Sequence, residues 1–143
     1  MKKEYGKLFY GGVRQSDTAK KLCPDLIVSK RLTERAHYIK ILSDADVCIG
    51  TLGLHGSTGW KTAEYVAAGK AIVNEHLIYE VPGGFKAGEN YLGFSSVDDA
   101  CEAVEALICD PMRLLEMKKA NQRYYENYLK PECLILNTIK NLT

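Results

Sequence analysis

The chain has 143 residues, of which 46% are hydrophobic, a common size for one domain with its own core. Its 19 Lys and Arg residues nearly balance its 18 Asp and Glu residues, and a formal net charge of +1 lacks the basic excess typical of nucleic-acid-binding domains. No apolar run reaches the roughly 18 residues of a membrane-spanning helix. We therefore expect one domain over residues 1–143, with no nucleic-acid partner and no membrane span.

The first third of the chain alternates short apolar segments with polar ones. A strand at Lys7–Tyr10 is expected to end at Gly11 and Gly12, which precede Arg14. The later patterns predict a short helix at Asp17–Leu22, a buried strand at Leu26–Ser29, and a helix that begins at the N-cap Thr33 and carries Ala36, Ile39 and Leu42 on one face.

The middle of the chain contains the most regular pattern. Val47–Gly50 predicts a strand, and a loop rich in Gly, Ser and Thr follows over residues 51–59. A helix is expected from Trp60 to about Ala68 with Gly69 after its end, and Ala71–Val73 predicts another buried strand.

The last third begins with an irregular segment over residues 75–90 and a short strand at 91–94. Ser96 and Asp99 have the spacing of a capping box before a helix with an apolar stripe. Asp110 and Pro111 predict a second helix start, and Pro131 a third. We expect these final helices, about 111–143, to pack on or beyond the domain.

Strands alternate with helices along the whole chain, which predicts an α/β fold with a Rossmann-like parallel sheet and helices on both faces. Ligands of such sheets bind at the carboxyl ends of the strands. Three loops therefore compete as the binding site: 11–14, 51–59 and 75–90.

Loop 51–59 has the composition of an anion site, because a strand ends, glycines follow and a helix begins. Lys61 adds a full positive charge in the first helical turn. The segment is not a P-loop, since Trp60 separates Gly59 from Lys61, and it has no G-x-G-x-x-G motif. Glu64, one turn into the helix, offers a carboxylate that can accept hydrogen bonds from a ribose diol.

These residues resemble the donor-binding, C-terminal domain of GT-B glycosyltransferases, including the group related to CgeB. The resemblance covers most of the chain, roughly Leu26 to Leu129. It rests on the segments Trp60–Val73, Ser43–Val47, Glu89–Leu92 with the helix at 97–109, and, for the CgeB group, Pro82–Leu92.

The resemblance implies a glycosyltransferase whose donor is a nucleotide diphosphate sugar. Glu64 matches the position that binds the ribose, Lys61 a basic position, and Gly59 the loop that meets the phosphates. The other expected site residues are Ser57, Thr58, Trp60, Thr62, His55 in the loop, and Gly12 with Arg14 as a phosphate clamp.

The resemblance also implies a partner, an N-terminal acceptor-binding domain of the same protein, so the isolated domain is expected to be incomplete and inactive. We expect no cofactor beyond the nucleotide-sugar substrate. The five cysteines are odd in number and lack C-x-x-C spacing, so we expect reduced thiols, a cytoplasmic location and no metal site.

Two alternatives remain open. Many retaining GT-B enzymes have an acidic residue at the position of Gly56, and this departure motivates a non-catalytic module that binds a ligand or a protein. A sugar-phosphate isomerase or epimerase of GT-B shape is the third hypothesis.

Overall fold

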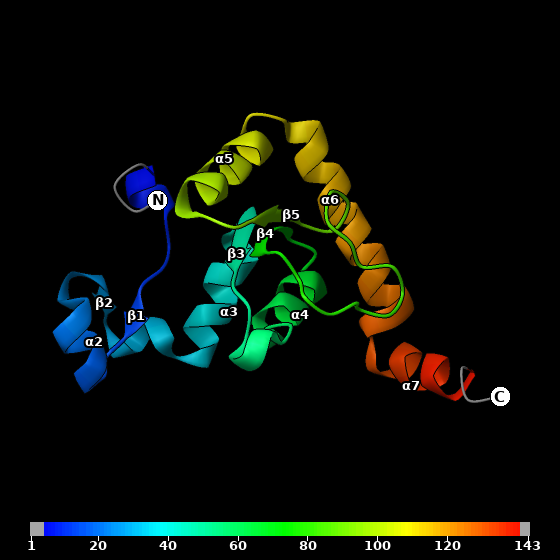
Figure 1. Cartoon of the computed structure of the whole chain (residues 1–143), viewed down its shortest axis with the longest axis horizontal. Coiled ribbons are helices and arrows are strands. Elements are labelled where there is room, and N and C mark those ends of the chain that lie inside the picture. Colours follow the sequence, from blue (N-terminus) through cyan, green and yellow to red (C-terminus); the bar gives the residue numbers. More distant parts are fainter. Residues whose placement is uncertain (1–4, 141–143) are drawn as a thin grey trace. The chain divides into compact units, whose positions relative to one another are not determined.

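The computed structural model describes residues 5–140 (Figure 1). The chain divides into two compact units, the first ending at Asp44 and the second beginning at Ala45. We describe each unit by itself.

The first unit holds two short parallel strands, with Val13 opposite Ile27 and Arg14 opposite Val28. Helix α2 begins after the N-cap Ser16, whose hydroxyl accepts a 3.0 Å hydrogen bond from the Ala19 amide. In chain order the elements are η1 (Gly6–Leu8), β1 (Val13–Arg14), α2 (Asp17–Leu22), η2 (Pro24–Leu26), β2 (Ile27–Val28), η3 (Lys30–Thr33) and α3 (Arg35–Asp44).

Two predictions for this unit are wrong. The segment expected as a strand at 7–10 forms a 3₁₀ turn instead, because Gly6 has a φ of +51° and its carbonyl accepts the Phe9 amide. Thr33 does not cap α3, since its hydroxyl donates to the Lys30 carbonyl within η3. The helix at Asp17–Leu22 and the strand core at Ile27–Val28 are confirmed.

The second unit contains a three-stranded parallel sheet in the order β3-β4-β5. Its helices α4 and α5 lie on opposite sides of the strands in Figure 1. The elements are β3 (Val47–Gly50), η4 (Leu54–Gly56), α4 (Trp60–Ala67), β4 (Ala71–Glu75), β5 (Leu92–Phe94), α5 (Val97–Ile108), α6 (Pro111–Tyr124), the π-helical turn η5 (Tyr125–Leu129) and α7 (Pro131–Lys140).

The expected fold class is therefore confirmed at the level of an α/β protein with parallel strands interleaved with helices and with additional C-terminal helices. Within residues 5–140 the hydrogen-bonded strands form two sheets, β1-β2 and β3-β4-β5, where one sheet was predicted. The helix expected to start at Pro111 is α-helical to Tyr124 and then widens into η5.

The helix-start signals of the second unit are confirmed. Ser96 and Asp99 form a capping box at α5, and the Asp110 carboxylate accepts the amides of Met112 and Arg113 at the start of α6. The apolar stripe of α5 is only partly buried: Ala100, Val104 and Leu107 are in the core, whereas Val97 and Ile108 are more than half exposed.

The core of the second unit is built around β4, whose Ala71, Ile72 and Val73 are completely buried. Helices α4, α5 and α6 contact this strand. Aromatic side chains hold the irregular segment 76–91 against α6. Within the segment Phe85 stacks on Tyr91, and Phe85 is also tilted against the ring of Tyr124 on α6. The segment that follows β4 is thus held by α6 although it has little regular structure of its own.

Candidate functional site

The carboxyl ends of β3 and β4 lie at one edge of the second sheet, as the parallel register pairs Gly50 with Asn74. Loop 51–59 leaves from this edge and leads directly into α4. The loop and the beginning of α4 are thus in the place where parallel α/β sheets bind their ligands.

The loop folds into a compact hydrogen-bonded turn. The Gly53 amide donates to the Ser57 carbonyl over 2.7 Å, and the Ser57 amide donates to the Leu54 carbonyl over 3.2 Å. His55, at the tip, has a left-handed backbone with φ 57° and ψ 30° and an exposed side chain. Ser57 and Thr58 are also exposed, so these three predicted residues present their side chains to solvent at the edge of the sheet.

Helix α4 begins at Trp60 after the N-cap Gly59, and no side chain caps it. The absence of a Cβ at residue 59 is required by the chain itself, since a Cβ would lie 2.8 Å from the Thr51 carbonyl oxygen. Gly59 therefore has a packing reason that is independent of any ligand. An uncapped helix start leaves backbone amides available to an anion, with the positive end of the helix dipole behind them.

The predicted residues on α4 separate into an outer and an inner group. Glu64 follows Trp60 by four residues and Lys61 by three, so both side chains are neighbours of Glu64 on the helix surface. Trp60 is 66% exposed, Lys61 is exposed and Glu64 is half-buried.

Thr62 belongs to the inner group and is 3% exposed. Its hydroxyl donates a 3.2 Å hydrogen bond to Oδ1 of the fully buried Asn74. The side chain of Thr62 thus fixes α4 to β4, and we do not assign it a contact with a ligand.

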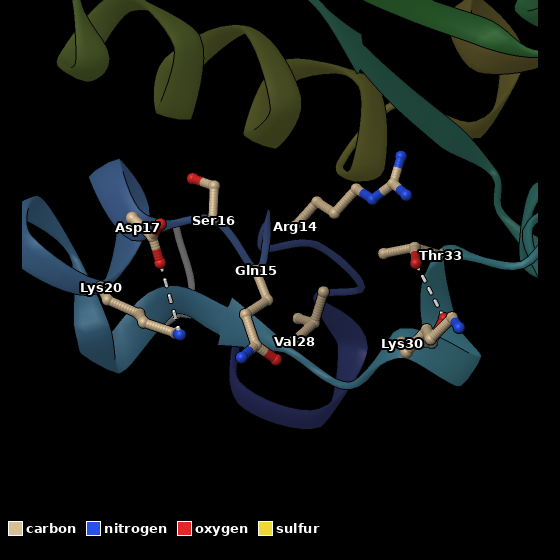
Figure 2. Close-up of a pocket in the computed structure, with 8 residues that line it drawn as sticks. All are labelled: Arg14, Gln15, Ser16, Asp17, Lys20, Val28, Lys30 and Thr33. Atoms are coloured by element: carbon tan, nitrogen blue, oxygen red, sulfur yellow. Dashed lines mark hydrogen bonds and ion pairs between the residues drawn. The ribbon is translucent and has the colours of Figure 1, made fainter.

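The two remaining predicted residues, Gly12 and Arg14, belong to the first unit. There an open pocket of about 470 Å³ lies at the carboxyl ends of β1 and β2 (Figure 2). Gly12 packs so closely against Val28, a lining residue, that a Cβ would collide with it. The pocket is lined by Arg14, Gln15, Ser16, Asp17, Lys20, Val28, Lys30 and Thr33.

The charge of this pocket is positive. Arg14, Lys20 and Lys30 supply three cations against the single carboxylate of Asp17, which lies 3.6 Å from the Lys20 ammonium. Figure 2 shows the Asp17–Lys20 pair at one side of the pocket and Lys30 at the other. An anionic ligand is therefore the type that the pocket favours.

Several residues of these sites were not predicted from the sequence. Lys20 and Lys30 line the first pocket, and Glu75 accepts a 2.6 Å hydrogen bond from the Leu52 amide at the start of loop 51–59. The signal for Glu75 was its position, directly after the buried residues of a strand, where a polar side chain reaches the binding edge of the sheet.

Other chemistry is limited in the described part of the chain. Residues 5–140 contain no group of three or more His, Cys, Asp or Glu side chains that could hold a metal ion. Burial raises the pKa of the Cys48 thiol to about 12, which keeps it protonated and unreactive at neutral pH. In the same residues no helix is long and apolar enough to cross a membrane.

Comparison of the chain with models of protein families, with curated proteins and with solved structures found no match.

Proposed function

We propose that this chain is the donor-binding domain of a glycosyltransferase and that loop 51–59 and the first turns of α4 bind a nucleotide diphosphate sugar. The observation that carries the proposal is the arrangement of Lys61 and Glu64 on one face of α4, next to a helix start that no side chain caps. The helix amides and Lys61 bind the diphosphate, and the Glu64 carboxylate accepts hydrogen bonds from the ribose hydroxyls.

Trp60 supports the same assignment. Its exposed indole neighbours Glu64 on the helix surface and offers an aromatic surface on which a base or a sugar ring can stack. The cationic pocket around Arg14 in the first unit favours an anionic ligand as well.

In the proposed reaction a hexosyl group passes from the nucleotide diphosphate to an acceptor held by an N-terminal domain of the same protein. As the bond between the sugar and the diphosphate breaks, negative charge develops on the leaving diphosphate. The α4 amides and Lys61 stabilise that charge, a contribution of the oxyanion-hole type. We propose a cytoplasmic location, since the five cysteines are odd in number and lack C-x-x-C spacing, as expected of reduced thiols.

Isothermal titration calorimetry with UDP, GDP and ADP tests the proposal. We expect one of the three to bind the wild-type chain, and Glu64→Ala to weaken that binding by about tenfold or more, the range for a lost hydrogen bond to a charged group. Glu80→Ala, which removes an exposed carboxylate after β4, is the matched control and should bind normally. If none of the nucleotides binds to the folded chain at millimolar concentration, the proposal is wrong.

A non-catalytic binding module is the second candidate, and one observation favours it. Gly56 has a φ of +73°, and a Cβ there would lie 2.6 Å from Cδ1 of Ile78. An acidic side chain at this position, as in many retaining GT-B enzymes, would therefore strain the left-handed backbone and displace the exposed Ile78 side chain. Assay of the full-length protein, with its acceptor-binding domain, for hydrolysis of nucleotide diphosphate sugars distinguishes the candidates: donor turnover that is lost in Glu64→Ala excludes the non-catalytic module.

A further inference from the structure

Strand β4 ends in two polar residues, Asn74 and Glu75, which hold loop 51–59 at both of its ends. At the start of the loop, the Leu52 amide donates a 2.6 Å hydrogen bond to Oε2 of Glu75. Just past its end, the Thr62 hydroxyl donates to Oδ1 of Asn74 over 3.2 Å. The two holding residues are adjacent on one strand, so the loop is closed by a single rigid element.

The Asn74 side chain is fixed within the core and is 0% exposed. Its Nδ2 donates a 2.7 Å hydrogen bond to the Glu75 carbonyl, which ties the two holding residues together. On β3, a Cβ at Gly50 would collide with Oδ1 of Asn74, so only glycine fits opposite this amide. Strand β3, strand β4 and helix α4 therefore meet around Asn74.

Glu75 differs from Asn74 because it is only half-buried and because its partner is a backbone amide of the loop. A hydrogen bond between an amide and a carboxylate is shorter and stronger than one between neutral groups. The 2.6 Å distance fits that class. Since Leu52 lies two residues after the end of β3, this bond sets the direction in which the loop leaves the sheet.

We propose that Glu75 is a positioning residue for loop 51–59: through the Leu52 amide it holds the loop, and with it the uncapped start of α4, in the conformation that receives the ligand. The hydrogen bonds of Glu75 and Asn74 suffice to position the loop. The consequence of that positioning for nucleotide binding rests on the proposed function.

The first measurement is amide hydrogen exchange of Leu52, followed by NMR without any ligand. In the wild type the Leu52 amide should be protected. In Glu75→Ala we expect its exchange to accelerate by about tenfold or more, whereas Glu75→Gln keeps an acceptor oxygen and should retain part of the protection. Glu80→Ala is the matched control and should leave Leu52 unchanged.

The second measurement is nucleotide affinity of the same variants by calorimetry, together with their thermal unfolding. We expect Glu75→Ala to weaken binding by about five- to tenfold at temperatures where the variant remains folded, and Glu75→Gln to recover part of the loss. A role in stability alone would lower the unfolding temperature and leave the affinity of the folded variant unchanged, and that result would overturn the proposal.

The two measurements distinguish a failure of the positioning role of Glu75 from a failure of the proposed nucleotide binding. Rapid exchange of Leu52 in the wild type overturns the positioning role even if Glu75→Ala fails to fold, because no variant is needed for that reading. If the Leu52 amide loses its protection in Glu75→Ala, the positioning role is supported. If the wild-type chain in the same experiments binds no nucleotide, it is the proposed function that is overturned.

Discussion

The side-chain amide of Asn121, on α6, donates a 2.7 Å hydrogen bond to the carbonyl of Lys70, directly before β4. The same nitrogen donates to the Asn90 carbonyl over 2.9 Å, and Oδ1 of Asn121 accepts the Asn90 amide group over 3.1 Å. Asn121 is completely buried and Asn90 is 3% exposed. One asparagine thus joins α6 both to the residue before β4 and to the end of the segment that leads into β5.

Asn121→Leu should destabilise the second unit strongly. The substitution leaves the carbonyls of Lys70 and Asn90 and the amide of Asn90 buried without their partner, and we expect a loss of about 2–4 kcal/mol in the free energy of unfolding. Urea unfolding measures it. Asn127→Ala, at an exposed asparagine in the following turn η5, is the control and should change stability by less than about 0.5 kcal/mol. A neutral effect of Asn121→Leu would contradict the network.

The hydroxyl of Tyr124 donates a 2.6 Å hydrogen bond to the Pro82 carbonyl, and burial raises the pKa of this phenol above its usual value of 10.0. Tyr124→Phe should cost about 1 kcal/mol of unfolding free energy at pH 7. Since the unfolded chain ionises Tyr124 first, the wild type should lose stability as the pH rises above about 10. Denaturant unfolding from pH 8 to 11 checks this, and an equal decline in Tyr124→Phe would refute it.

The Asp46 carboxylate lies 2.6 Å from the Lys118 ammonium, and this hydrogen bond holds the pKa of Asp46 below its usual value of 3.8. A lowered carboxyl pKa stabilises the fold above that value and ceases to do so as the pH falls through the folded pKa. Asp46 is largely exposed, so we expect Lys118→Gln to cost only about 0.2–1 kcal/mol at pH 7. The difference from the wild type should shrink as the pH falls below 3.8, and a constant difference would contradict the assignment.

The elements of the second unit were largely predictable because their signals are local. Short continuous apolar runs located β3 and β4, Gly69 adopts the left-handed conformation expected after α4, and Ser96 forms its capping box. The segment at 7–10 was not predictable, because its three apolar and aromatic residues, Leu8, Phe9 and Tyr10, fit a strand as well as a turn. The left-handed backbone of Gly6 turns the chain there, and within residues 5–140 no strand pairs with the segment, a relationship that depends on distant residues.

The candidate site was predictable only as a segment. Sequence reasoning placed Trp60, Lys61 and Glu64 near a helix start, and their common face follows from helical spacing. It also expected Thr62 at the ligand, but the partner that draws Thr62 inward, Asn74, lies on a different strand. The bond between Leu52 and Glu75 joins residues 23 positions apart, a relationship that no local pattern reveals.

Arg14→Gln should weaken the binding of inorganic pyrophosphate to the first unit. The substitution removes one of the three cations that line the pocket, and we expect a loss of affinity of about three- to tenfold. The loss should diminish as salt is added, because salt screens the attraction between the cations and the pyrophosphate. Calorimetry at about 20 and about 200 mM salt, below and above physiological ionic strength, measures the affinity. Arg31→Gln, at an exposed arginine outside the pocket lining, is the matched control. Equal losses in both variants would show only a general charge effect.

The central claim is that nucleotide binds at the start of α4, and the fluorescence of Trp60 tests it most directly. Trp60 is the only tryptophan of the chain and is 66% exposed, so its emission reports on that place alone. The protein is titrated with UDP, GDP and ADP, with excitation at the red edge of the indole band and correction for nucleotide absorbance. At least one nucleotide should change the emission in a saturable way, and Glu64→Ala should raise the nucleotide concentration at the midpoint. Emission that stays constant up to millimolar nucleotide in the folded protein would contradict the account.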